Sequence, residues 1–150
     1  MPTFISGTQA VITFDNTGGT PVDMSTTISK VDLKATAGVA SFNTFGTNVA
    51  YKTEGKRNYS GTITFPSAED TSSFDYTASA WFHPGASNVM GSKTLKVETP
   101  DATAASYRYE GEIRAKDGDI VMQDAGGDGT PAMKTLSFEW DSEPTRTIIT

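Results

Sequence analysis

The chain has 150 residues, a formal net charge of −6 at pH 7 and no cysteine. This length suits one domain with its own core, and no stretch approaches the ~20 consecutive apolar residues of a membrane-spanning helix. The absence of cysteine excludes disulfides, thiol catalysis and cysteine-ligated metals.

The distribution of charge and the N-terminal sequence limit the expected partners and location. Residues 1–97 contain seven acidic and seven basic residues, whereas residues 98–150 contain eleven acidic and five basic ones. An acidic chain without a basic stripe is expected to repel nucleic acid phosphates. The first ten residues, MPTFISGTQA, lack the basic start and apolar run of a signal peptide. We therefore expect a protein that is used in the cytoplasm or delivered as part of a larger particle.

Alternation of apolar and polar residues predicts that most of the chain forms β-strands. In the clearest case, Tyr107–Lys116, every even-numbered residue is charged and the odd-numbered residues form one largely apolar face. The other strand candidates are residues 10–14, Ser29–Leu33, Val39–Phe42, Asn58–Phe65, Thr94–Thr99, Asp119–Met122, residues 135–140 and Arg146–Ile149. The glycine-rich segments Asp15–Thr20 and Asp124–Pro131 separate them as loops. Because no linker or repeat interrupts the pattern, we expect a single mainly β domain over residues 1–150.

One segment, Ser67–Phe82 (SAEDTSSFDYTASAWF), follows a helical period instead, with Phe74 and Trp81 on one face. Its first residue and Asp70 are placed to cap the start, and His83-Pro84-Gly85 would end it. The segment predicts one amphipathic helix of about three turns that packs Phe74 and Trp81 against the sheet.

The stretch Ser41–Phe65, SFNTFGTNVAYKTEGKRNYSGTITF, begins and ends like a strand but has a polar middle. We predict a long inter-strand loop there, in which Lys52, Lys56 and Arg57 outweigh Glu54 to give a local charge of +2. A loop of this length has a high entropic cost unless something orders it.

The residue patterns of enzymes and metal sites are missing. His83 is the only histidine, which with the lack of cysteine argues against a Ser-His-Asp triad and a zinc site. The acidic residues between 117 and 128 do not have EF-hand spacing and are typical of turns. Glu110 and Glu112 could suggest a glycosidase pair, but arginines alternate with them and indicate a salt-bridged surface. We expect no enzymatic activity, no metal and no cofactor.

Three short motifs in sequence carry a family resemblance. Asp23–Leu33 (DMSTTISKVDL) is followed by Thr44-Phe45-Gly46 at a strand end, and Tyr59–Ile63 (YSGTI) then leads through a strand into the helix. This succession resembles the major tail tube proteins of long-tailed bacteriophages. The resemblance covers roughly residues 10–85 and continues beyond them only as a general β pattern. It gives no family role to Asn43, Lys56 or Arg57.

The resemblance implies a β-sandwich or barrel-like core with one flanking α-helix and a long inter-strand loop. It implies a structural virion protein of the phage tail, made in the host cytoplasm, whose subunits form hexameric rings. The rings would stack, with other tail proteins, into a hollow tube through which DNA passes without specific binding. In that family the long loop reaches a neighbouring subunit, so assembly would offset its ordering cost.

We accordingly expect the loop of this chain to contact another copy. A basic loop that meets an acidic surface makes a head-to-tail contact, the type that builds rings and filaments. Two aromatic side chains would be apolar anchors within a polar rim. The residues of this contact would be Phe45, Tyr51, Lys52, Glu54, Lys56 and Arg57.

Two alternatives remain open at this point. The chain could be another virion β protein, such as a tail terminator or a head decoration protein, built on a related fold. It could also be a carbohydrate- or receptor-binding module in which an exposed tryptophan or tyrosine stacks on a sugar ring. Trp81 and Trp140 both lie in segments predicted to face a core, which argues against the binding module.

Overall fold

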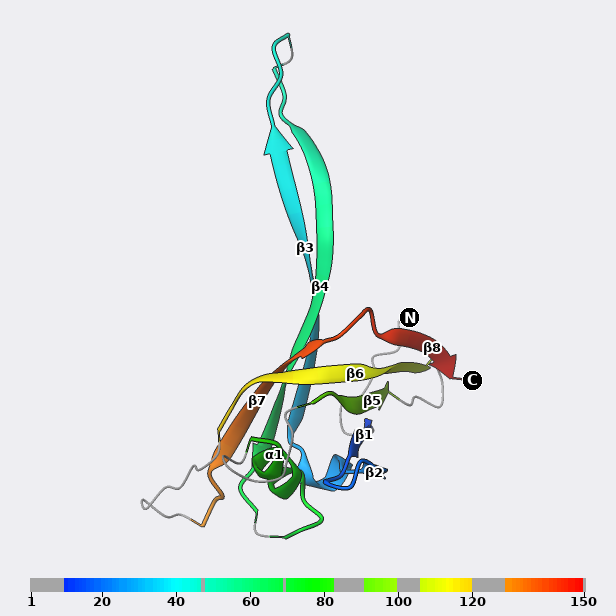
Figure 1. The fold of residues 1–150 in the computed structure, drawn as a ribbon, viewed down its shortest axis with the longest axis vertical. Helices are drawn as coiled ribbons and strands as arrows, with labels where there is room; N and C mark the ends of the chain where they lie inside the picture. Colours follow the sequence, from blue (N-terminus) through cyan, green and yellow to red (C-terminus); the bar gives the residue numbers. More distant parts are fainter. Residues whose placement is uncertain are drawn as a thin grey trace, which may run out of the picture.

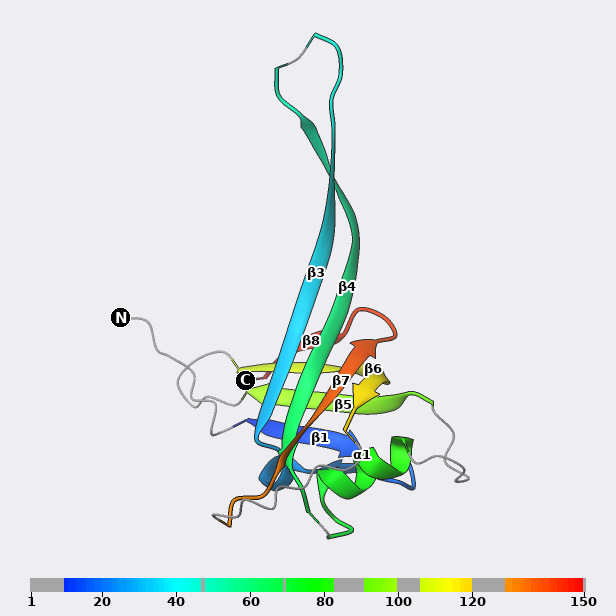
Figure 2. The same ribbon diagram turned by 90° about the vertical axis from the view of Figure 1, so that its left-hand side faces the viewer.

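The computed structural model describes residues 10–46, 48–68, 70–82, 91–99, 106–119 and 129–149. The elements are β1 (Val11–Asp15), β2 (Pro21–Asp23), the 3-10 helix η2 (Ser25–Thr27), β3 (Lys30–Phe42), β4 (Tyr51–Pro66), α1 (Phe74–Phe82), β5 (Lys93–Thr99), β6 (Ser106–Gly118), β7 (Met133–Trp140) and β8 (Thr145–Ile149). All strand pairs are antiparallel, in the order β2-β1-β5-β6-β7-β4-β3, and β8 pairs with the part of β6 that β7 does not reach. The sheet curls into a half-barrel with α1 packed against it (Figures 1 and 2). The predicted mainly β fold, with a barrel-like core and one flanking α-helix, is confirmed for the described residues.

The inner face of the curled sheet and one face of α1 enclose a single hydrophobic core. Its buried side chains are Ile12, Phe14, Met24, Ile63, Phe65, Phe74, Ala78, Trp81, Leu95, Val97, Ile113, Leu136, Phe138 and Trp140. The Phe74 ring lies edge-on to Phe14 and Phe65, with centroids 5.1 and 4.8 Å away, an arrangement that aromatic quadrupoles favour. The inward faces predicted from the alternation, and the packing of Phe74 and Trp81 on the sheet, are therefore confirmed.

Two glycines on these inward faces are covered by aromatic rings. A Cβ atom at Gly61 would lie 2.4 Å from both the Asp32 carbonyl oxygen and the Phe138 ring. One at Gly111 would lie 2.9 Å from the Trp140 ring. Glycine is needed at both positions because only a residue without a side chain lets the rings approach the backbone this closely.

Helix α1 begins at Phe74, seven residues later than the predicted start at Ser67. Ser73 is the residue that caps it, because Ser73 Oγ accepts a hydrogen bond from Tyr76 N at 3.2 Å. Asp70 instead organises the preceding turn: its carbonyl accepts from Ser73 N, and its carboxylate accepts from Ser72 N. The bond from Ser72 holds the pKa of Asp70 below its ordinary value. The predicted helix end at His83-Pro84-Gly85 lies outside the described residues.

A buried ion pair fastens α1 to the sheet. Lys134 Nζ on β7 lies 2.7 Å from Asp75 Oδ1 in the first turn of α1, and both side chains are more than nine-tenths buried. Asp75 also accepts hydrogen bonds from Ala68 N at 2.7 Å and Ser79 Oγ at 3.3 Å. These partners compensate for the removal of two charges from water, a removal that would otherwise be strongly unfavourable.

The segment that opens the family resemblance connects the sheet edge to the helix. Ser25 Oγ accepts a hydrogen bond from Ile12 N at 2.8 Å and donates one to the Asp23 carboxylate. Thr27 Oγ1 accepts from Phe74 N at 3.1 Å, at the start of α1. The hydrogen bonds from the Ser25 side chain and backbone hold the pKa of Asp23 below its ordinary value. Two hydroxyls of η2 thus connect β1, β2 and α1 through hydrogen bonds.

Candidate functional site

A two-stranded arm projects from the body of the protein (Figures 1 and 2). Strand β4 pairs with β7 only over Ser60–Pro66, whereas its pairing with β3 continues out to Tyr51. We call residues 35–59 the arm and residues 42–51 the arm tip; Thr47, within the tip, lies outside the described residues. The arm is the part of the hairpin that has no third strand beside it.

The arm replaces most of the loop predicted from the sequence. Five of the six predicted contact residues lie in strand β4: Tyr51, Lys52, Glu54, Lys56 and Arg57. The sixth, Phe45, lies in the connection between the strands, which spans only residues 43–50. The segments Ser29–Leu33 and Val39–Phe42 were predicted as separate strands. Both belong to one continuous strand, β3, and only Ser29 lies outside it. Five of the six candidate contact residues are therefore held on a β-ladder, and only Phe45 lies in a loop.

The apolar side chains of the arm are exposed to solvent. The exposed fractions of Phe45, Val49 and Val39 are 107%, 77% and 65%. Phe42 and Tyr51 stack on each other across the ladder, with ring centroids 5.5 Å apart, and each remains about half exposed. An isolated two-stranded hairpin is marginally stable in water, and clustered exposed apolar groups mark interaction surfaces. The arm therefore has the character of a contact surface for a partner.

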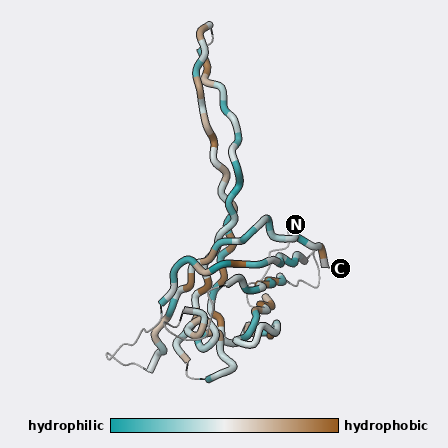
Figure 3. Tube along the Cα trace, in the orientation of Figure 1, coloured by the Kyte–Doolittle hydropathy of each residue, from teal (hydrophilic) through white to brown (hydrophobic). Residues whose placement is uncertain are grey.

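The two strands of the arm differ in chemistry. Residues 35–51 contain no charged side chain, whereas β4 then carries Lys52, Glu54, Lys56 and Arg57. Figure 3 shows this as hydrophobic colour along β3 and hydrophilic colour along β4. Arg57 lies 3.2 Å from Glu54, and its pKa is raised first by a hydrogen bond to the Tyr59 side chain and then by Glu54. Within the described part of the chain, Lys52 and Lys56 form no ion pair, so both charges are available to a partner.

A β-bulge interrupts the arm between Ala37 and Val39, where the register with β4 shifts. Gly38 and Gly55 meet there: a Cβ atom at Gly55 would lie 3.2 Å from the Gly38 carbonyl oxygen. Bulges increase the local twist of a strand pair, and the arm is visibly coiled in Figure 2.

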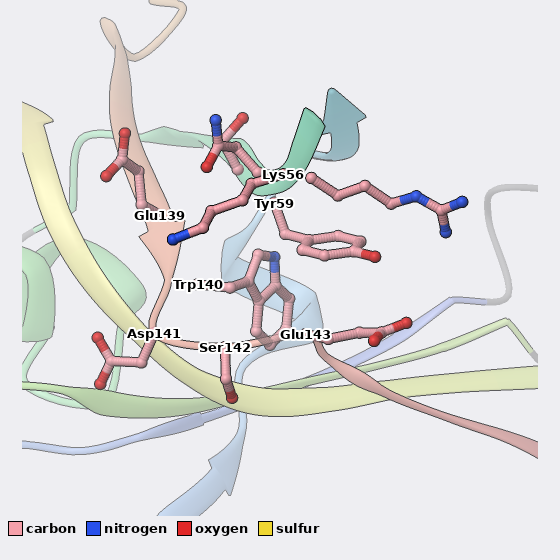
Figure 4. A pocket seen from close by; sticks show the side chains of 10 residues that line it. Lys56, Tyr59, Glu139, Trp140, Asp141, Ser142 and Glu143 are labelled. Carbon is pink, nitrogen blue, oxygen red and sulfur yellow. The ribbon is translucent and has the colours of Figure 1, made fainter. Parts of the chain in front are cut away.

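A groove of about 630 Å³ lies where the arm leaves the sheet, and we call it the base groove (Figure 4). Its lining residues are Lys56, Arg57, Asn58, Tyr59, Ser60, Glu139, Trp140, Asp141, Ser142 and Glu143. Basic side chains of β4 and carboxylates from the acidic last third of the chain thus line the same groove. Two of these carboxylates already pair with β6, Glu139 with Lys116 at 3.5 Å and Asp141 with Arg114.

A second groove of about 820 Å³, the end groove, is formed by residues of β1, η2, the start of β3 and the end of β5. Its lining residues are Ala10, Ile12, Ser25, Thr26, Ile28, Ser29, Lys30, Val31, Val97 and Thr99. Five of the ten residues are apolar and provide most of the wall surface, four carry hydroxyl groups, and Lys30 is the only charged residue among them. The end groove includes the first residues of β3, whereas the arm tip begins at the last residue of β3. The groove and the tip therefore lie at opposite ends of this strand.

The described residues contain no group of three or more histidine, cysteine, aspartate or glutamate side chains that could hold a metal ion. Asp119, one of the acidic turn residues, accepts a hydrogen bond from Thr135 N at 3.0 Å and so closes the end of β6 onto β7. Asp124, Asp128 and His83 lie outside the described residues. None of the helices in the described ranges has the length and apolar character to cross a membrane.

The charged outer face of β6 is salt-bridged, as its sequence predicts. The partners come from neighbouring strands: Arg108 Nε lies 3.0 Å from Glu98 of β5, and the Thr94 hydroxyl donates a hydrogen bond to Glu112. Glu110 and Glu112 are exposed on this face, and neither points into a described cleft of the kind that binds a sugar.

No protein-family model and no curated protein sequence matches the chain. Solved structures do match it over nearly its whole length. A chain in the 6-fold symmetrised cryo-EM structure of the anti-feeding prophage baseplate has a TM-score of 0.73 at 12% identity, covering 98% of this chain and 97% of that one.

Two further structures show the same fold. In the extended sheath–tube complex of PVC, an extracellular contractile injection system, the TM-score is 0.66 at 9% identity, with 97% and 92% of the two chains covered. In the tail of an empty GTA particle, refined helically with C6 symmetry, it is 0.63 at 15% identity, with 97% and 98% covered. The chain therefore shares its fold with chains of three phage-tail-like assemblies.

Proposed function

We propose that this chain is a structural subunit of a phage tail or tail-like tube. Six copies form a ring, and rings stack around a hollow lumen through which DNA passes. The observation that carries the proposal is the arm, a long exposed hairpin that no other strand in the described part of the chain supports. The shared fold with chains from six-fold and C6-symmetric assemblies supports it, as does the resemblance of residues 10–85 to tail tube proteins.

The arm supplies the contact between copies. Ordering exposed backbone and side chains has an entropic cost, which burial against another copy offsets. Phe45 and Tyr51 are the apolar anchors at the tip. Further along β4, Lys52, Lys56 and the Glu54–Arg57 pair form a polar rim that meets an acidic surface of the next copy. A contact between two different surfaces of the same chain is heterologous, so it closes into rings or continues as a tube.

The net charge suits a passage for DNA. Each chain carries −6, so a ring of six carries six times that charge, −36. Where acidic side chains line the lumen they repel phosphates, and DNA slides past without being held. No site for nucleic acid binding is required.

A subunit that forms one terminal ring is the second candidate. A chain in the cryo-EM structure of the anti-feeding prophage cap, a tube terminating cap, favours it, with a TM-score of 0.68 at 13% identity over 99% of this chain and 94% of that one. A terminal component stops at a single ring, whereas a tube subunit continues to add rings. A sugar-binding module is disfavoured because Trp81 and Trp140 are 3% and 8% exposed and cannot stack on a sugar ring.

Negative-stain electron microscopy of the purified chain, over a range of concentration and salt, tests the proposal. We expect hollow tubes with six-fold end views. The matched control replaces residues 36–58 with an Asn-Gly turn, which keeps the core strands and removes the arm. It should fold, by circular dichroism, and form no tubes. Single rings alone would instead favour the terminal component, and dispersed monomers under all conditions would contradict both candidates.

A further inference from the structure

We propose that the arm tip of one copy docks into the end groove of another copy. This inference rests on the proposed function and identifies the surface that receives the arm. The sequence predicted only that the basic residues of the arm meet an acidic surface, with Phe45 and Tyr51 as apolar anchors, and it did not identify the surface that receives these anchors.

The tip and the groove cannot meet within one chain. The groove includes Lys30 and Val31 at the start of β3, and the tip begins at Phe42, where β3 ends. The 13 residues of β3 span about 40 Å, because a strand rises roughly 3.3 Å per residue. Each copy therefore carries the donor surface at one end of a rigid strand and the receiving surface at the other end.

The two surfaces have matching chemistry. The tip is uncharged and exposes Phe45 and Val49 almost fully, beside the Phe42–Tyr51 stack. The end groove has mainly apolar walls, and the charge of its one lysine is met by Asp32 at 3.5 Å. Burying the apolar groups of the tip against this groove leaves no ion unpaired, because Lys30 keeps Asp32 as its partner.

The base groove fits the tip less well. Carboxylates of β7 and the following turn line it, together with Lys56 and Arg57 of the same arm. An apolar tip placed there would remove these charges from water without giving them partners, which is unfavourable. The end groove is therefore the receiving surface that the tip favours.

This contact joins copies head to tail and repeats. Every copy donates one tip and offers one groove, so no copy inside an assembly is left with either surface exposed. A single tip is smaller than the ~800 Å² per partner of a standard interface, and several such contacts acting together in a ring supply the missing affinity.

Cysteine cross-linking tests the assignment, because the chain contains no cysteine of its own. The test variant combines Asn43→Cys in the tip with Thr26→Cys at the groove; both positions are exposed. The matched control combines Asn43→Cys with Thr17→Cys, an exposed threonine in the β1–β2 turn that does not line the groove. Assembled particles are oxidised and analysed by denaturing electrophoresis without reductant.

We expect a ladder of covalent oligomers from the test variant and at least tenfold less from the control. Tubes or rings that form without this ladder would overturn the docking site and leave the proposed function standing. A cross-link of Thr26→Cys to Phe4→Cys, with none to Asn43→Cys, would overturn it by identifying residues 1–9 as the occupant. Failure of the unmodified chain to form any particle would remove the proposed function itself.

A second variant keeps the tip unchanged and blocks the groove. Thr26→Arg places a long charged side chain at the groove while replacing an exposed residue, so the monomer should keep its circular dichroism spectrum and melting temperature. We expect assembly to be lost, whereas Thr17→Arg should assemble normally. Normal assembly of Thr26→Arg would overturn the docking site.

Discussion

The two halves of the β3–β4 hairpin share one antiparallel ladder but have opposite surroundings. In the half next to β7, Ile63 and Phe65 are completely or almost completely buried. In the arm, Val39 and Phe45 are mostly or fully exposed. Both halves have the same backbone pairing, so pairing alone does not distinguish them. The difference is a third strand and a core, which the described residues provide for the half next to β7 and do not provide for the arm.

The largest expected effect separates a core phenylalanine from an arm phenylalanine. Phe74→Ala should lower the free energy of unfolding by about 4 kcal/mol, because it leaves a cavity between Phe14 and Phe65. Phe45→Ala should leave that free energy unchanged and abolish or weaken assembly. Urea denaturation measures the free energy of unfolding, and electron microscopy measures assembly. A large loss of monomer stability in Phe45→Ala would contradict the difference between core and arm.

The buried ion pair should give the next largest effect. Lys134→Met removes the charge and leaves Asp75 buried without its cation, which should lower the free energy of unfolding by about 3 kcal/mol. The double variant Lys134→Met/Asp75→Leu removes both charges and should regain most of that loss. Chemical denaturation checks both, and a double variant less stable than the single one would contradict this account of the pair.

Charge reversal on the arm should have a moderate effect, confined to assembly. Changing Lys52, Lys56 and Arg57 to glutamate should raise the protein concentration needed for assembly about tenfold, equivalent to about 1.4 kcal/mol, since exposed pairs contribute at most about 1 kcal/mol each. Light scattering measures this concentration. Added salt should weaken assembly of the wild type more than that of the variant, because it screens the attraction between exposed charges. The Debye length is about 10 Å at 0.1 M salt. Equal assembly by both proteins would show that the three charges lie outside the contact.

The smallest expected effect concerns the hydrogen bonds between Ser25 and the Asp23 carboxylate, and it depends on pH. The folded-state pKa of Asp23 is lowered by Ser25, so its stabilising contribution is present above the unfolded pKa of about 4 and is lost as pH falls through the folded pKa. Asp23→Asn should therefore be slightly less stable than wild type at pH 7 and equally stable near pH 2. Thermal melts across this range measure the difference, and a difference that does not change with pH would contradict the assignment.

The core was predictable because its pattern is local. Alternation identified the inward faces that bury Ile113, Leu136 and Phe138, and helical spacing identified Phe74 and Trp81. The helix start was wrong, because acidic and hydroxyl residues favour a preceding turn as well as a cap. At Asp70, no local sequence signal distinguishes a residue that caps the helix from one that forms the turn before it.

The arm and the ion pair depend on partners far away in the sequence. Tyr51–Arg57 shows no apolar alternation, because neither face of the arm is buried in its own chain, and its strand conformation comes from pairing with β3. Lys134 and Asp75 are 59 positions apart, and only the fold brings them together. The sequence did locate six residues that lie in the arm, and their role in a contact between copies stays a prediction.

The outer edge of β3 has a consequence for the time before assembly. It is the last strand of the sheet in the described residues, and its backbone groups on that side have no strand partner. Charged side chains are a common protection of such edges against mispairing; β3 has Lys30, Asp32 and Lys34 near the body and none beyond them. The edge of a newly made chain is thus protected against mispairing along its body and unprotected along its arm. Its useful lifetime in the free state should depend on how quickly the arm finds its proper partner.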